Sequence, residues 1–186
     1  MTAIALEPPF AFANATSCGR SPKMPMNEAH FEAFYRSHAG PVWSYIYRMT
    51  SNAATADDLL QKTFFRFLRT NPEIANEDHL RRYIYKTATN LVMDHFRESK
   101  RQRAISEMPA PEFRSDQTDL RHDMMRVFSQ LKPQDRALLW LAHVEGSSHA
   151  EIAEMLGVKE KSIKVMLFRA RKRLGEMLSK RGLAPA

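Results

Sequence analysis

The chain has 186 residues, of which 44% are hydrophobic and 26% charged, enough apolar content for one modest domain or two small ones. Its formal net charge of +7 and isoelectric point of about 9.7 favour a polyanionic partner such as nucleic acid. The single cysteine, Cys18, excludes an internal disulfide framework and a zinc site built on cysteine pairs, and it suits a reducing cytoplasm. No apolar run approaches the ~20 residues that cross a bilayer, so we expect no membrane insertion.

The first fifty residues divide into an irregular part and a helical part. Residues 1–27 are rich in Pro, Ala, Ser and Asn without a sustained period, which predicts a disordered amino-terminal arm. A helical apolar pattern starts at Phe31, and Gly40-Pro41 interrupts it before Val42. Because proline removes a backbone donor, this interruption predicts a broken helix or two short ones.

Two further helices are expected before residue 103. Thr55 and Asp58 have the spacing of a capping box, which predicts a helix through Arg69 with a stripe of Leu60, Phe64, Phe67 and Leu68. After a polar loop over 71–78, a long helix is expected from about His79 to Arg97. Its expected buried residues are Leu80, Ile84, Ala88, Leu91 and His95. Residues 28–103 are therefore predicted to form a first, all-α domain.

Residues 104–119 separate this domain from a second one. They contain Pro109 and Pro111 and four acidic residues against Arg114 alone, which predicts a flexible acidic linker. A new amphipathic pattern then begins at Leu120, and residues 120–182 are predicted to form a second helical domain. No strand-like alternation is long enough to build a sheet, so the expected fold is all-α.

The second domain carries the pattern of a helix-turn-helix. Pro133 suits the first turn of one helix, and Ser148 with Glu151 forms a capping box for the next. Gly157 supplies the turn, and a last helix starts near Glu160. Its expected core side contains Ile163, Leu167, Ala170, Leu174 and Leu178.

The opposite side of this last helix predicts DNA binding. Between residues 160 and 181 there are eight Lys or Arg against two Glu, and Val165 and Phe168 lie among these cations. A solvated basic face has no need of such apolar groups, whereas a major-groove helix places apolar atoms against thymine methyls and cations against guanine and phosphate. The candidate DNA-binding residues are Lys161, Ser162, Lys164, Val165, Phe168, Arg169, Arg171 and Lys172.

The long helix of the first domain has a second basic face. Between residues 81 and 103, seven Lys or Arg accompany two acidic residues. Helical spacing brings Tyr83, Lys86, Asn90, Met93 and Arg97 to one side. Basic, amide and aromatic groups in this mixture suit single-stranded DNA, although an ordinary exposed face of a helical bundle is the alternative on this segment alone.

Over about residues 30–182 the chain resembles the extracytoplasmic-function group of sigma factors, bacterial subunits of the sigma-70 family that direct RNA polymerase to promoters. Residues 56–64 (ADDLLQKTF) resemble the polymerase-binding helix of that family, and residues 83–97 resemble its −10 element helix. In the second domain, residues 144–148, 151–153, 162–164 and 168–171 resemble the −35 helix-turn-helix. Several motifs in the family's order make the resemblance specific.

The resemblance implies a division of labour. It assigns polymerase contacts to Asp57, Asp58, Gln61 and Lys62, and −10 contacts to Asn76, Arg82, Tyr83, Lys86, Asn90 and Arg97. The 71–78 loop is expected to capture a flipped base, and the second domain to read −35 duplex DNA. The implied partners are promoter DNA, the β′ clamp and β flap of core polymerase, and an anti-sigma factor. In family members the linker threads toward the active-site cleft, while a solvated tether is the alternative here.

Three departures from the family pattern affect the expected contacts. Lys62 replaces the acidic residue that usually follows the glutamine, which reverses one charge of the polymerase-binding helix. Tyr83 stands where Trp is usual, and Val165 and Met166 stand where Ser and Arg are common. The promoter sequence read by this chain is therefore expected to be atypical.

Other function classes fit the sequence less well. A stand-alone helix-turn-helix repressor leaves the exposed face of the first domain unexplained. A sigma-like decoy that binds an anti-sigma factor without reading DNA predicts loss of cations such as Lys164 and Arg171, which are present. The seven His are scattered, with His95 and His143 expected in helical cores, and no metal, phosphate-loop or nucleophile motif appears. We therefore expect no catalytic residues, metal or cofactor, and a cytoplasmic location.

Overall fold

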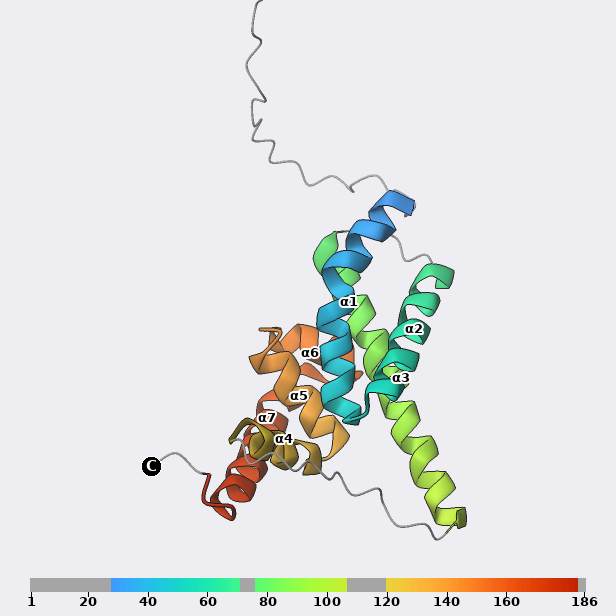
Figure 1. Ribbon diagram of the computed structural model, residues 1–186. Helices are drawn as coiled ribbons and strands as arrows, with labels where there is room; N and C mark the ends of the chain where they lie inside the picture. The colour runs from blue at the N-terminus through green and yellow to red at the C-terminus, as the bar shows by residue number, and fades with distance from the viewer. Residues whose placement is uncertain (1–27, 71–75, 107–119, 184–186) are drawn as a thin grey trace, which may run out of the picture.

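The computed structural model describes residues 28–70, 76–106 and 120–183, and within these ranges the chain is helical with no strand. The arm predicted over 1–27, and residues 107–119 of the predicted linker, lie outside the described residues. Seven helices follow one another (Figure 1). They are α1 (Glu28–Thr50), α2 (Ala53–Thr70), α3 (Glu77–Ser106), α4 (Leu120–Gln130), α5 (Pro133–His143), α6 (His149–Leu156) and α7 (Glu160–Ser179). The all-α prediction is confirmed.

Helix α1 does not break at Pro41, so the prediction of a broken helix or two short ones was wrong. Pro41 and Gly40 are both exposed, and the backbone carbonyl that loses its partner at a proline can reach water there. On either side of the proline, Phe34 and Val42 are buried, so packing against the core holds one continuous helix. Tertiary burial here outweighs the local cost of proline.

The ends of α2 and α3 also differ from the expected ones. Asn52 caps α2, because its Oδ1 accepts a hydrogen bond of 2.8 Å from the Thr55 backbone N–H, so Thr55 is not the cap. Helix α3 begins at Glu77 and continues to Ser106, well past the expected end at Arg97 and three residues into the predicted linker.

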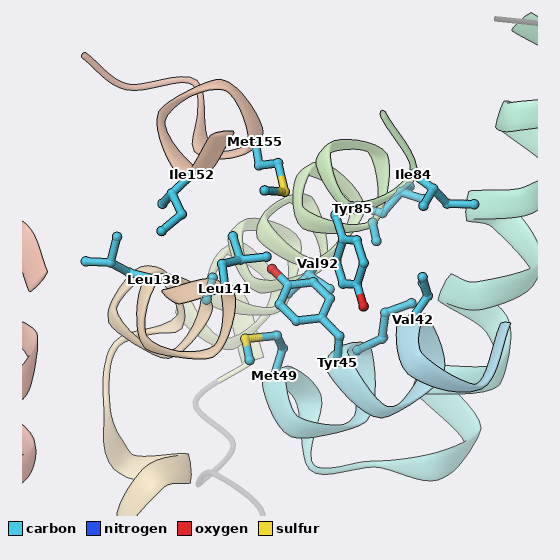
Figure 2. Packing of buried hydrophobic residues seen from close by; sticks show 14 of the residues in the cluster. Val42, Tyr45, Met49, Ile84, Tyr85, Val92, Leu138, Leu141, Ile152 and Met155 are labelled. Carbon is cyan, nitrogen blue, oxygen red and sulfur yellow. The ribbon is translucent and has the colours of Figure 1, made fainter. Parts of the chain in front are cut away.

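The two halves of the chain share one hydrophobic core. Helices α1 to α3 form the first half and α4 to α7 the second, and α3 packs on both α2 and α6 (Figure 1). Figure 2 shows Tyr45 and Met49 of α1 facing Leu141 of α5 and Met155 of α6 across this core. All four side chains are 0% or 1% exposed. The two predicted domains are therefore packed against each other along much of their length.

Two adjacent stripes of α3 are buried, which explains how one helix can serve both halves. Ile84 and Ala88 lie beside Tyr85 and Thr89, and all four are at most 2% exposed. The Tyr45 hydroxyl of α1 is within 2.8 Å of the Thr89 hydroxyl, which satisfies both polar groups inside the core. Helix α3 is thus the central element of the fold.

Candidate nucleic-acid interface

The turn between α6 and α7 has the local structure that the sequence predicts. The Glu151 backbone N–H donates to Ser148 Oγ at 3.3 Å, and the Ser148 backbone N–H donates to Glu151 Oε2 at 2.8 Å. Gly157 closes α6 with φ of 65°, a left-handed conformation that favours glycine. Both the capping box and the glycine turn are confirmed, and together they fix where α7 begins.

Helix α7 buries one side and exposes the other. Ile163, Leu167 and Ala170 are buried, as expected for its core side, while Leu174 and Leu178 are half-buried. The opposite face carries Val165 and Phe168, which are 49% and 67% exposed. Around them, Lys161, Lys164, Arg169, Arg171 and Lys172 are all exposed, and Ser162 is half-buried. We interpret these exposed apolar groups among cations as a candidate binding surface.

One cation of the exposed α7 face, Arg171, is hydrogen-bonded to His143, which the sequence predicted to be buried. Arg171 Nε donates a hydrogen bond of 3.1 Å to Nε2 of His143, at the end of α5. His143 is exposed, so its prediction as a core residue was wrong, whereas His95 is half-buried against Phe96. This hydrogen bond joins α7 to the end of α5.

The α3 residues that were predicted to contact the −10 element are not all exposed on one face of the helix. Lys86, Asn90 and Arg97 are exposed, as predicted. Tyr83 is half-buried, and its ring meets the edge of Phe67 with centroids 5.9 Å apart. Packing against α2 therefore removes part of the stacking surface that the helical spacing suggested.

Arg82 is directed toward the second half of the chain. Its guanidinium lies 3.2 Å from Glu151 Oε1 and 3.5 Å from Glu154 Oε2, both on α6. Arg81 adds a contact of 3.9 Å with Glu151 and a hydrogen bond of 3.4 Å to the Glu145 carbonyl. In this arrangement Arg82 contacts the helix-turn-helix, and its side chain is 23% exposed.

Asn76 has a structural partner of its own. Its Oδ1 accepts a hydrogen bond of 2.7 Å from the His79 backbone N–H, which caps α3. Residues 71–75 of the predicted base-capture loop lie outside the described residues. The exposed amide of Asn76 therefore marks the described end of that loop.

Two carboxylates of the predicted polymerase-binding surface on α2 already have partners within the chain. Asp57 Oδ1 accepts a hydrogen bond of 2.7 Å from Trp43 Nε1 of α1. Asp58 Oδ2 forms an ion pair of 2.7 Å with Lys62, the residue that departs from the family pattern. Gln61 is exposed beside them.

Next to these carboxylates lies an apolar groove that sequence reasoning missed. Its volume is about 680 Å³, and its lining includes Tyr35, Phe65 and Leu68, which are 42%, 64% and 49% exposed. Leu68 was expected in the buried stripe of α2 and is instead on this surface. Phe65 lies outside that stripe by helical spacing, which is the signal that could have revealed the groove.

Burial and hydrogen bonding shift the pKa values of several ionisable groups where the halves meet. Burial lowers the pKa of Arg136 to about 10, and its guanidinium lies 5.1 Å from the centre of the Phe96 ring. Burial, and next the nearby Glu145 carboxylate, raise the pKa of Tyr85. The backbone hydrogen bond from Ser148, followed by the Ser148 hydroxyl and Arg82, lowers the pKa of Glu151. The contact region is therefore structured and closely packed.

Neither a metal cluster nor a membrane-spanning helix is found in the part of the chain that the structure describes. Across residues 28–70, 76–106 and 120–183, no three His, Cys, Asp or Glu gather into a candidate metal site. No helix in these ranges is both long and apolar enough to cross a bilayer.

The fold and its exposed faces define a class: an all-helical protein of two packed halves, one of them a helix-turn-helix whose last helix is basic. Residues 34–102 match the family described as sigma-70 region 2, and residues 121–174 match sigma-70 region 4. The chain therefore belongs to the extracytoplasmic-function group of the sigma-70 family.

Individual relatives agree with this assignment. The chain is 29% identical over 160 residues to the ECF RNA polymerase sigma factor SigE of Mycolicibacterium smegmatis, with 81% of this chain and 62% of that protein aligned. It is 27% identical over 164 residues to SigL of Mycobacterium tuberculosis, with 83% of this chain and 92% of the relative aligned. The chain thus spans less than two thirds of SigE but nearly all of SigL.

Two solved structures have a similar fold. The sigma factor RpoE from Bartonella quintana, in complex with the anti-sigma factor NepR, has a TM-score of 0.66 at 20% identity. That match covers 80% of this chain and 96% of the other. CnrH, in complex with the cytosolic domain of CnrY, has a TM-score of 0.61 at 19% identity, with 83% and 90% covered.

Proposed function

We propose that this chain is an alternative sigma factor that binds core RNA polymerase and directs initiation at a particular set of promoters. The observation that carries the proposal is the exposed face of α7, where Val165 and Phe168 lie among five exposed cations. Such a face suits the major groove, with α7 reading the −35 element through base edges and phosphates. The chain is proposed to act in the cytoplasm as a binding subunit, without catalysis of its own.

The first half is proposed to hold the polymerase and the −10 element. The groove beside Asp57, Asp58, Gln61 and Lys62 on α2 offers apolar and acidic groups together, which suits a docking surface for the β′ clamp. Lys86, Asn90 and Arg97 on α3 supply exposed polar and basic groups for the −10 strand. The second half is proposed to contact the β flap in addition to DNA.

An anti-sigma factor is proposed as the regulator. The solved relatives RpoE and CnrH are complexes with an anti-sigma factor and with the cytosolic domain of CnrY. A protein that covers exposed promoter-reading groups can keep a sigma factor inactive without any chemical step. Our proposal of such a partner rests on these relatives and on the amount of exposed binding surface.

The decisive experiment is transcription with bacterial core polymerase, this chain and a pool of genomic fragments, with start sites mapped by sequencing. Transcripts that appear only when the chain is present, and that share elements near −10 and −35, support the proposal. A chain that binds core polymerase but gives no such transcript would be a decoy. Specific DNA binding without polymerase binding would instead identify a repressor.

A further inference from the structure

A basic cleft lies between the two halves of the chain, beside the α7 face, with which it shares Arg169, and away from the α2 groove described above. Its volume is about 490 Å³, and three elements line it. Helix α3 contributes Arg97 and Lys100, the start of α5 contributes Lys132, and α7 contributes Arg169 and Arg173. Five cations from both halves of the chain thus border one small space.

These cations are poorly compensated. The lining contains one carboxylate, Asp135, and it is ion-paired with Arg173. Arg97 meets Asp94 at 2.8 Å, in a pair whose side chains are 78% and 57% exposed. Within the described ranges, no carboxylate forms an ion pair with the three remaining cations, Lys100, Lys132 and Arg169. Like charges so close together repel one another, and an anion between them would remove that cost.

Two further features of the cleft favour an anion attached to a flat apolar group. Helix α5 starts here at Pro133 without a side-chain cap, so its positive end opens toward the space. Phe96, Met93 and Met166 supply an apolar part of the wall. The buried Arg136 guanidinium lies 5.1 Å from the centre of the Phe96 ring.

We propose that this cleft binds a small ligand carrying several adjacent phosphates, such as a nucleoside triphosphate. The cations and the start of α5 would hold the phosphates, and the Phe96 wall would hold the base. The volume falls in the range of about 300–1,000 Å³ that is usual for small-ligand sites.

The ligand would also stabilise the packed arrangement. Because α3 forms one wall and α7 the other, the complete site exists only while the halves are together. A ligand that binds only one arrangement shifts the population toward it. The binding inference stands on the cleft alone, whereas its effect on transcription rests on the proposed function.

The direct test is calorimetric titration of the full chain with GTP, and separately with inorganic tripolyphosphate, at fixed salt. We expect one saturable site per chain. Lys100→Glu combined with Lys132→Glu should weaken binding at least tenfold, since neither residue is among the proposed promoter or polymerase contacts. Lys180→Glu combined with Arg181→Glu is the matched control, because it makes the same charge change at exposed positions that do not line the cleft.

The outcomes separate the possible sources of affinity. GTP binding more tightly than tripolyphosphate supports a base contact at Phe96, and equal binding supports a site for phosphates only. Absence of saturable binding, or an equal loss in the cleft and control variants, overturns the proposal. Circular dichroism checks folding, and if the double variant does not fold, Lys132→Ala alone should still weaken binding about threefold.

The expected effect of the ligand on polymerase binding is tested by a separate measurement. Tripolyphosphate should weaken association of the wild-type chain with core polymerase but leave association of the Lys100→Glu, Lys132→Glu variant unchanged. No difference between the two proteins would overturn the regulatory part while leaving the calorimetric result intact. Transcription by the Lys132→Ala variant without added tripolyphosphate tests the proposed sigma activity separately, and it should match that of wild type.

Discussion

Arg82 of α3 donates a hydrogen bond of 3.2 Å to Glu151 of α6, so a residue expected to contact −10 DNA is bound to the capping residue of the helix-turn-helix. Elements at −10 and −35 are about 25 base pairs apart, roughly 85 Å at 3.4 Å per base pair. Here α3 and α7 line the same cleft. If α3 and α7 read these elements as proposed, the packed arrangement cannot reach both at once, and we expect the halves to separate before promoter binding.

Removing the Arg82 side chain should favour this separation. Arg82→Ala deletes the contacts with Glu151 and Glu154, in a region where the paired side chains of Arg82 and Glu151 are each 23% exposed. A loss of about 1–2 kcal/mol corresponds to a roughly fivefold to thirtyfold larger open population. Small-angle scattering should show a larger radius of gyration for the variant.

Arg101→Ala is the control for this measurement. Arg101 pairs with Glu98 at 2.5 Å within α3 itself, so its removal should leave the scattering curve unchanged. An unchanged curve for Arg82→Ala as well would mean that the shared apolar core, and not the ion pairs, holds the halves together.

Acidification should selectively remove the stabilisation contributed by Glu151. Its pKa is lowered in the folded chain, first by the Ser148 backbone hydrogen bond, so the ionised form stabilises the fold. That contribution is complete above the ordinary value near 4.5 and is lost as pH falls through the lower folded value. Urea unfolding of wild type and Glu151→Gln should therefore differ by about 1 kcal/mol at pH 7 and progressively less below pH 4.5.

Glu154→Gln serves as the comparison for the pH experiment. It lies on the same helix and also faces Arg82, but it does not cap α6. It therefore controls for the loss of a carboxylate beside Arg82. A constant difference for Glu151→Gln across the same range would contradict the capping argument.

Local features of this fold were predictable and long-range ones were not. The capping box of Ser148 and Glu151 spans three residues, and the sequence shows it directly. The contact between Arg82 and Glu151 joins residues 69 positions apart. The spacing of apolar residues along a helix shows which side is buried, but it does not reveal which other helix that side will contact. The signal that the sequence did offer for burial of α3 on two sides is that Ile84 and Tyr85, two consecutive residues, are both large and largely apolar.

The same distinction explains the site residues. Exposure of Val165 and Phe168 follows from helical spacing alone, because α7 has one core-facing stripe. Tyr83 was misplaced because its contact with Phe67 depends on how α2 packs on α3. The basic cleft needs residues from three helices, so no single segment of sequence could indicate it.

Two substitutions on α7 test promoter reading. Lys164→Ala and Arg171→Ala should each weaken promoter binding by the polymerase complex, by about 1–3 kcal/mol if the side chain contacts a base. A phosphate contact would instead reduce the salt dependence and weaken all sequences alike. Both residues are exposed, so thermal stability should change little.

His143→Ala refines this test, because it removes the acceptor for Arg171 without touching the proposed contacts. The loss of promoter affinity in His143→Ala should be smaller than the loss in Arg171→Ala. When Arg171→Ala is already present, adding His143→Ala should cause no further loss. Lys180→Ala is the control for loss of a distant charge. A footprint unchanged by Lys164→Ala and by Arg171→Ala would remove α7 from the proposed −35 interface.

Trp43 should matter for polymerase binding through Asp57. Its indole donates to Asp57 Oδ1 at 2.7 Å, while its ring stacks on Tyr47 with centroids 5.1 Å apart. The bond holds the carboxylate beside the apolar groove that contains Phe65. Trp43→Phe keeps an aromatic ring but removes the donor, so affinity for core polymerase should fall severalfold with little loss of stability.

A double-mutant cycle decides whether Trp43 acts through Asp57. If Trp43 only positions this carboxylate, adding Trp43→Phe to Asp57→Asn should cause almost no further loss of affinity, because the group that the indole orients has already lost its charge. Additive losses would mean that Trp43 contributes to the interface independently. Fluorescence anisotropy of the labelled chain titrated with core polymerase measures the affinity of wild type, the two single variants and the double variant.

Lys62→Ala in the same assay tests whether the ion pair with Asp58 weakens docking, in which case affinity should rise when that carboxylate is released.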